Sequence, residues 1–72
     1  MFRKNDLLRD HLRERFHVTA PGVPAFTGLL LNVGKANLEF ADVKYNGVTA
    51  EGHLFVDRHP GLYLQRLPNA TG

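Results

Sequence analysis

Four histidines and seven acidic residues are the side chains of this sequence with the clearest capacity for chemistry. A metal site needs ligands at a fixed spacing, for example two histidines at i and i+4 on one helix. The four histidines do not follow such a spacing, and the sequence has no cysteine to complete a thiolate site. They are His11, His17, His53 and His59. We therefore expect no metal centre and no cofactor.

The carboxylates are equally poor candidates for catalysis. General acid–base chemistry needs two acids that converge on one cleft. The acids of the central and C-terminal segments are spread along the chain, with no nucleophile elbow and no glycine-rich phosphate-binding loop beside them. These acids are Glu39, Asp42, Glu51 and Asp57. We therefore predict that the protein is not an enzyme and that its polar side chains bind rather than react.

Length and composition limit what can position these side chains. The 72 residues make one domain, residues 1–72, and a chain of this size buries only about 60% of the surface that it exposes when unfolded. Its 43% hydrophobic and 22% charged residues are typical of a folded globular domain. Without cysteine it has no disulfide to stabilise the core, so we expect self-association. The net charge of +2 permits contact with nucleic acid without requiring it.

The sequence contains no expected membrane segment. Its longest apolar run is Leu29-Leu30-Leu31, far shorter than the roughly 20 residues that span a bilayer. The N-terminal segment has basic residues but no apolar block that resembles a signal peptide. We therefore expect a soluble, cytoplasmic protein with no membrane partner.

An amphipathic α-helix is predicted over residues 5–16. Leu8, Leu12 and Phe16 lie at i, i+4 and i+8, and Asn5 stands at the position of a helix cap. The opposite face carries mixed charges, which can be a solvated surface or a secondary basic surface for an anionic partner. The arginines of that face are Arg9, Arg13 and Arg15.

From Phe16 onward the pattern alternates between apolar and polar residues, which indicates strands. Within the third strand, Leu38, Phe40 and Asp42 are expected on one face and Ala41 and Val43 on the other. Gly and Pro clusters and Asn46-Gly47 separate the strands as turns. The predicted strands cover residues 16–20, 26–33, 37–45, 51–57 and 62–67.

Together these elements predict a mainly β fold. An N-terminal helix precedes a five-stranded, strongly bent antiparallel barrel of the small Sm-like or SH3-like type, at about residues 17–67. Gly28 lies within the long second strand, where a residue without a side chain allows the sharp bend that a small barrel needs. Residues 68–72 are small and polar and are expected to form a flexible tail.

Two segments resemble the motifs of the Sm-like family. Residues 26–43 are similar to the first Sm motif, with an aromatic residue, the bending Gly28, alternating apolar residues, a loop with Asn37 and an apolar strand that ends in an acidic residue. Residues 52–64 are similar to the second motif in length, in their first glycine and in their apolar rhythm. The resemblance covers about residues 5–67.

The resemblance implies a homo-oligomeric ring. In Sm-like proteins the last two strands of neighbouring subunits pair edge to edge and close a ring of six or seven copies, as a head-to-tail contact does when its rotation closes. Such pairing would also satisfy strand edges that are otherwise unpaired. The implied interface residues are Leu54, Phe55, Val56, Leu62, Tyr63 and Leu64.

The resemblance also implies RNA binding at loops that face a central pore. Asn37 matches the family's base-binding asparagine, Lys35 lies at a position that often holds a base-stacking side chain, and Arg58 is one place away from the family's arginine. Two departures weaken base recognition: Gly34 takes the place of the motif aspartate, and Asp57 takes that of the arginine. Asn37 can instead be a turn residue that bonds its own backbone, and Arg58 a solvated or Asp57-paired arginine.

Two other functions stay open. The barrel can serve as a structural or protein-interaction subunit of a larger assembly that reads no RNA, for which the loop departures are expected. A third reading is a monomeric SH3-like adaptor for peptide or DNA, because SH3-like barrels share the same five-strand rhythm. The sequence does not distinguish these readings from the RNA-binding ring.

Overall fold

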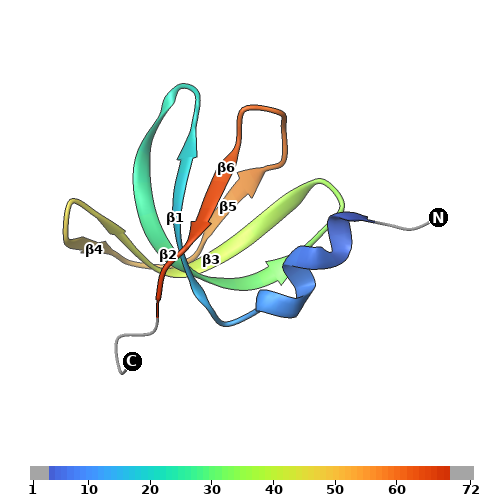
Figure 1. The fold of residues 1–72 in the computed structure, drawn as a ribbon. Coiled ribbons are helices and arrows are strands. Elements are labelled where there is room, and N and C mark those ends of the chain that lie inside the picture. Colours follow the sequence, from blue (N-terminus) through green and yellow to red (C-terminus); the bar gives the residue numbers. More distant parts are fainter. Residues whose placement is uncertain (1–3, 69–72) are drawn as a thin grey trace.

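The described part of the chain folds into a mainly β structure. The computed structural model describes residues 4–68, which form one antiparallel sheet of six strands and one short helix (Figure 1). Residues 69–72 of the predicted flexible tail lie outside the described residues. The helix is η1 (Lys4–His11), and the strands are β1 (Arg15–Ala20), β2 (Val23–Val33), β3 (Asn37–Tyr45), β4 (Val48–Ala50), β5 (Leu54–Asp57) and β6 (Tyr63–Arg66).

The predicted α-helix over residues 5–16 is wrong in both type and length. Element η1 is a 3-10 helix that ends at His11, and Arg13 has a positive φ of 69°. The Arg13 N–H then donates to the Leu30 carbonyl at 2.6 Å, and the Leu30 N–H donates to the Glu14 carbonyl at 3.0 Å. The backbone therefore pairs with β2 before the predicted helix ends. Phe16 fits the helical stripe and the strand alternation equally well, and its burial in β1 decides between them.

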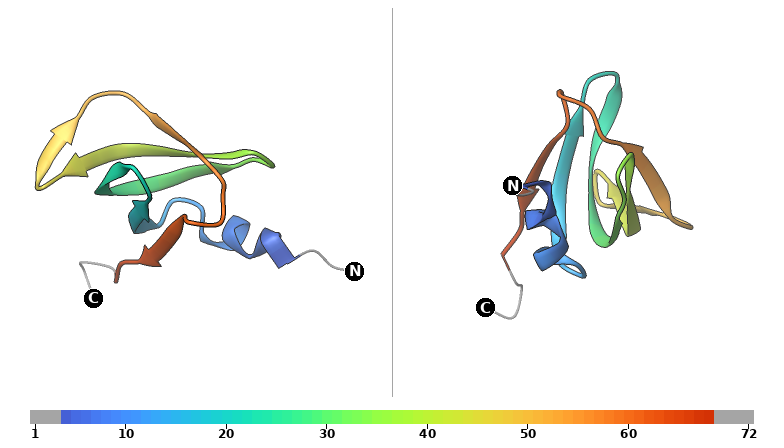
Figure 2. Two further views of the ribbon diagram at one scale, coloured as in Figure 1. Left: turned by 90° about the horizontal axis from the view of Figure 1, so that it is seen from above. Right: turned by 90° about the vertical axis from the view of Figure 1, so that its right-hand side faces the viewer.

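The strand order is β4-β3-β2-β1-β6, and β5 pairs with the edge of β3 that also holds β4. The predicted strand over residues 51–57 is confirmed only at β5, whereas β4 was not predicted, and Gly52 has a φ of +86° in the bend between them. β4 pairs with the last residues of β3, and β5 pairs with its first residues. The three views together show a strongly curved sheet, with η1 against β2 (Figure 2).

The core lies inside this curve. Leu30, Leu38 and Phe40 are completely buried, and the Phe26 and Phe40 rings meet edge to face with centroids 5.4 Å apart. The remaining buried hydrophobic residues come from β1, β2 and β3. They are Phe16, Val18, Val33 and Val43. Strands β1, β2 and β3 therefore supply the core, while β4, β5 and β6 cover its margins.

The alternation of β3 changes at Asp42, which corrects the predicted faces of this strand. Leu38 and Phe40 share one face as predicted and are buried there, but Asp42 is exposed and Val43 is buried. Asp42 has a positive φ of 50°, and the register shifts by one residue between the Leu29–Ala41 and Thr27–Lys44 pairs. This is a β-bulge, in which one extra residue reverses the side-chain direction beyond it.

No helix among residues 4–68 is long and apolar enough to cross a membrane.

Candidate functional site

The turn between β2 and β3 and the segment after β5 lie side by side. The guanidinium of Arg58 donates from Nη1 to the Gly34 carbonyl at 2.9 Å, and the Arg58 backbone N–H donates to the Ala36 carbonyl at 2.9 Å. Asn37 also faces Asp57 in the register of β3 and β5. The three residues predicted to bind RNA, Lys35, Asn37 and Arg58, are therefore brought to one edge of the sheet. We call this group the loop cluster.

The side chains of the loop cluster differ in how firmly they are held. Lys35 and Asn37 are exposed, and Arg58 is half-buried and fixed on the Gly34 carbonyl. The Gly34 N–H donates to the Asn37 main-chain carbonyl at 2.9 Å, and no residue in 4–68 hydrogen-bonds the Asn37 side chain. The turn is thus closed by backbone atoms, which leaves the Asn37 amide available to a ligand.

Gly34 supports this arrangement by its lack of a side chain. A Cβ at Gly34 would lie 3.2 Å from the Asn37 carbonyl oxygen and 3.4 Å from Asn37 Oδ1. The position that matches the motif aspartate therefore has little room for a side chain in this turn. The Gly34 carbonyl instead anchors Arg58, a role that the residue types alone do not indicate.

The three arginines predicted as a secondary basic surface do not share a helix face. Arg9 is on η1, Arg13 lies in the connection after it, and Arg15 begins β1. Arg15 donates from Nη1 to Asp42 Oδ2 at 2.7 Å and from Nη2 to the Asp42 carbonyl at 3.2 Å. The charge of Arg15 is therefore balanced by Asp42, which corrects the prediction of one basic helical face.

Two carboxyl groups that accept hydrogen bonds from arginine side chains have lowered pKa values. The hydrogen bond from Arg66 to Glu14, at 3.0 Å, lowers the pKa of Glu14, and His11 at 3.0 Å on the same oxygen adds to the effect. The hydrogen bond from Arg15 lowers the pKa of Asp42. Because Glu14 and Arg66 lie 52 residues apart in the chain, this pair joins the start of β1 to β6.

Strands β5 and β6 each have one free edge. β5 pairs with β3 and β6 pairs with β1, and no other described strand pairs with either of them. In an antiparallel pair, residues whose backbone groups bond to the partner strand alternate with residues whose backbone groups point away from it. The bonds from Arg58 to Ala36 and from Leu67 to Arg15 show which residues of β5 and β6 bond to their partner strands. The backbone N–H and C=O groups of Phe55 on β5 and Leu64 on β6 therefore point outward from the sheet.

The residues predicted as the oligomer interface divide into two groups. Phe55 and Tyr63 expose 61% and 71% of their surface. The other four are half-buried and pack against the core, which keeps the two edges in place. These four are Leu54, Val56, Leu62 and Leu64.

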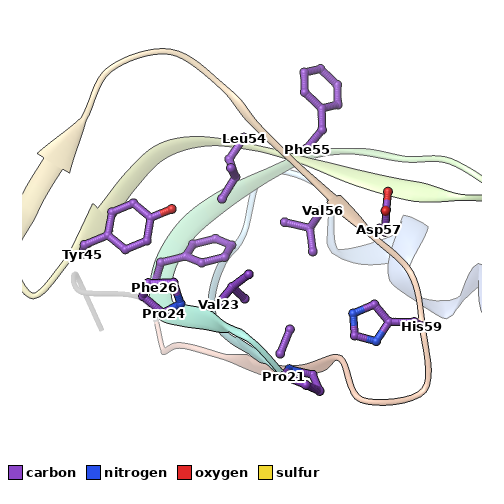
Figure 3. Close-up of a pocket in the computed structure, with 11 residues that line it drawn as sticks. Pro21, Val23, Pro24, Phe26, Tyr45, Leu54, Phe55, Val56, Asp57 and His59 are labelled. Atoms are coloured by element: carbon purple, nitrogen blue, oxygen red, sulfur yellow. The ribbon is translucent and has the colours of Figure 1, made fainter.

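An apolar groove of about 360 Å³ lies between β5 and the turn that joins β1 to β2. Phe26 lies in its floor, Val56 forms part of one wall, and Pro21 and Val23 form the other (Figure 3). The Phe55 side chain points away from the groove, to the other face of β5 (Figure 3). A strand added to the free edge of β5 would therefore lie next to apolar surface on both of its faces.

Two of the histidines pair with carboxylates. His53 Nδ1 lies 2.6 Å from Glu39 Oε2, and His11 Nδ1 lies 3.0 Å from Glu14 Oε1. The ring Nδ1 of His59 accepts a hydrogen bond from the Gly61 N–H at 3.3 Å. No group of three or more possible metal ligands occurs in the part of the chain that the structure describes.

Some polar residues that the fold holds in defined positions could not be found from the sequence pattern. The Glu39–His53 pair links β3 to the segment before β5, and it depends on a register that the sequence does not specify. Lys44 is on the outer face of β3 only because of the bulge at Asp42. The outward alternation of His17 in β1 was a usable signal, since its neighbours Phe16 and Val18 are buried.

No protein-family model, curated protein or solved structure matches this chain.

Proposed function

We propose that this chain is an Sm-like protein that assembles into a homo-oligomeric ring, with six or seven copies expected, and binds single-stranded RNA at the loop cluster. The observation that carries the proposal is the pair of free strand edges on β5 and β6. These two edges are the ends of one curved sheet, and each presents outward backbone donors and acceptors beside an exposed aromatic residue, Phe55 or Tyr63.

The two edges suit a contact between different surfaces of identical chains. Pairing of β5 in one copy with β6 in the next uses each edge once per copy, so the contact is head-to-tail. Such a contact forms a ring when the rotation closes, and it removes the exposed edges that would otherwise favour aggregation. In our proposal the curved sheet of each chain is a small Sm-like or SH3-like barrel, and its edge strands pair with those of the neighbouring copies.

The loop cluster supports the RNA half of the proposal. Single-stranded RNA is recognised by stacking on aromatic or guanidinium planes, by hydrogen bonds to base edges and by cationic contact with phosphates. Arg58 offers a fixed guanidinium plane, Asn37 an unpartnered amide, and Lys35 an exposed ammonium. In a ring, the loop clusters of several subunits would contact the same RNA molecule, so that individually weak contacts together give higher affinity.

One observation favours the alternative of a structural or protein-interaction subunit. Asp57 is exposed beside the loop cluster, and Gly34 leaves no carboxylate or aromatic side chain in the turn. In that case the ring would form as proposed, and its partner would be another protein. Under either reading we expect the protein to act in the cytoplasm without enzymatic activity.

Substitution of the fixed guanidinium tests the RNA half. We expect fluorescence anisotropy to show binding of a labelled single-stranded RNA at low salt, with weaker binding as salt rises. Arg58→Gln should weaken it by roughly 5- to 150-fold, the equivalent of one stacking contact of about 1–3 kcal/mol.

Arg66→Gln is the matched control, since Arg66 pairs with Glu14 away from the loop cluster. It should lower affinity far less than Arg58→Gln. Absence of binding at low salt by an assembled ring would refute RNA recognition and leave the protein-interaction subunit.

A further inference from the structure

A row of polar side chains crosses the outer face of the sheet. His17 on β1 pairs in register with Thr27 on β2, and Thr27 pairs with Lys44 on β3. Residues that face each other in register project from the same side of a sheet. Their neighbours Val18, Phe26 and Val43 are buried, so the row lies on the face opposite the core.

The row continues onto the flanking strands. Gln65 on β6 pairs with His17, and Thr49 on β4 pairs with Lys44. Five adjacent strands therefore carry five hydrogen-bonding side chains in one line. With strands about 4.8 Å apart, the line is roughly 19 Å long. It contains no acidic residue.

The middle of the row is hollowed. A depression of about 270 Å³ is lined by His17, Thr27 and Lys44, by Ala25 and Phe26 of β2, and by Asn46 and Gly47 of the turn after β3. Asn46 has a φ of 52° and Gly47 a φ of 82°, conformations that turn the chain sharply at the rim of the hollow. We call this depression the outer hollow.

The polar groups of the outer hollow have unused hydrogen-bonding capacity. Among residues 4–68, nothing hydrogen-bonds or forms an ion pair with the side chains of His17, Thr27 and Lys44. Asp42 lies near enough to feel the Lys44 charge, but Arg15 already donates to its carboxylate at 2.7 Å. The hollow therefore presents an ammonium, an imidazole, a hydroxyl and an amide, with no carboxylate on its lining.

This set of donors fits a phosphate. Phosphate oxygens accept hydrogen bonds from lysine, threonine and asparagine side chains and from backbone N–H groups in nucleic-acid complexes. An open line of donors across five strands suits an extended chain better than a small free anion, which needs an enclosed set of donors. We propose that the outer hollow binds a phosphate of a single-stranded nucleic acid, whose chain lies along the row from Gln65 to Thr49.

The outer hollow is separate from the loop cluster. It lies on the outer face beside the turn after β3, whereas Lys35 and Arg58 lie at the other end of β3, beside its first residue. The inference therefore requires neither the ring nor RNA contact at the loop cluster.

Amide chemical shifts of the full chain can test the two sites in one experiment. The probes are a short oligouridylate and inorganic phosphate. We expect the oligonucleotide to shift the amides of His17, Thr27, Lys44 and Asn46 at concentrations where inorganic phosphate has little effect. Shifts there with inorganic phosphate alone, or no shift there with either probe, would overturn the proposal. Shifts at Lys35 and Arg58 report on the loop cluster separately.

Variants assign the contact to the outer hollow. Lys44→Gln should weaken the oligonucleotide response of His17 and Thr27 about tenfold, because a charge-assisted bond to phosphate is lost. Arg66→Gln is the matched control, because it removes one positive charge from a residue that pairs with Glu14 and belongs to neither site, and it should leave the response of the hollow unchanged.

Thr27→Val keeps the shape of the strand and removes one hydroxyl, so it should also weaken the response while the spectrum stays that of a folded chain. An unchanged response in both Lys44→Gln and Thr27→Val would overturn the assignment.

Discussion

Gly28 shows how one residue without a side chain allows two strands to approach closely. It is buried in the middle of β2, and a Cβ there would lie 3.2 Å from Phe40 Cβ and 3.4 Å from Phe40 Cδ1. Phe40 is completely buried and its Cβ moves only with the backbone of β3. The close approach of β2 and β3 at this point therefore depends on glycine.

Gly28→Ala should destabilise the protein. Overpacking of a full core costs about 1–3 kcal/mol, and the lower entropy of the unfolded alanine chain offsets about 0.4–1 kcal/mol of that cost. We expect a net loss of about 1–2 kcal/mol in the free energy of unfolding, measured with urea.

Thr49→Ala, at an exposed position of β4, serves as the control and should change stability by less than about 0.5 kcal/mol. An equal effect of the two substitutions would contradict the close approach at Gly28.

At the scale of elements, the sequence predicted the strands better than their faces. Residues 37–45 were predicted with the bounds that β3 has, because alternation and flanking turns mark both ends. The bulge at Asp42 could not be predicted, since an aspartate can also occupy an outward-facing position of a regular strand that has no bulge. Because the bulge was not predicted, Lys44 was not expected on the outer face, and the outer hollow was not predicted either.

The helix prediction failed for a related reason. Leu8, Leu12 and Phe16 satisfy a helical stripe, but pairing of the backbone with β2 starts at Arg13 and draws Phe16 into β1. The spacing of apolar residues gives no information about this competing backbone contact with Leu30 of β2. The loop cluster was predicted as three residues, yet the Gly34 carbonyl that positions Arg58 depends on tertiary structure.

The ionic contacts between elements predict a dependence of stability on acid. The folded pKa values of Glu14 and Asp42 are lowered by Arg66 and Arg15. A lowered carboxyl pKa stabilises the fold fully above its ordinary value of about 4, and this contribution is lost as pH falls through the lowered pKa. We therefore expect the urea midpoint to fall as pH decreases below about 5.

Glu14→Gln should make this decline less steep. Glu51→Gln, at an exposed site between β4 and β5, should leave the slope as it is in the parent protein. A decline that is the same in the parent protein and in Glu14→Gln would show that the Glu14–Arg66 contact does not link β1 to β6 in solution.

The free edge of β6 predicts a specific change in assembly. Tyr63→Asp places a charge beside the edge that is proposed to pair with β5 of the next copy, so it should shift sedimentation at micromolar concentration toward single chains. Leu7→Asp is a matched control on η1, because Leu7 and Tyr63 are 70% and 71% exposed. Equal sedimentation of the two variants would exclude the Tyr63 edge as the contact.

At the scale of the whole molecule, size and topology lead to the same expectation. A domain of 72 residues without disulfides has a small core, and here the core comes from β1, β2 and β3. Each of the outer strands β4, β5 and β6 leaves one edge unpaired in the described chain, and an exposed aromatic residue lies beside the edges of β5 and β6. Assembly would add apolar contacts and backbone hydrogen bonds at the edge strands β5 and β6, where the single chain has the fewest of these contacts and bonds.

The mass of the native particle tests ring assembly most directly. Sedimentation equilibrium or native mass spectrometry of the full chain at micromolar concentration should give six or seven times the chain mass of 8.1 kDa. A particle of 8.1 kDa that persists as concentration rises would contradict assembly through the β5 and β6 edges.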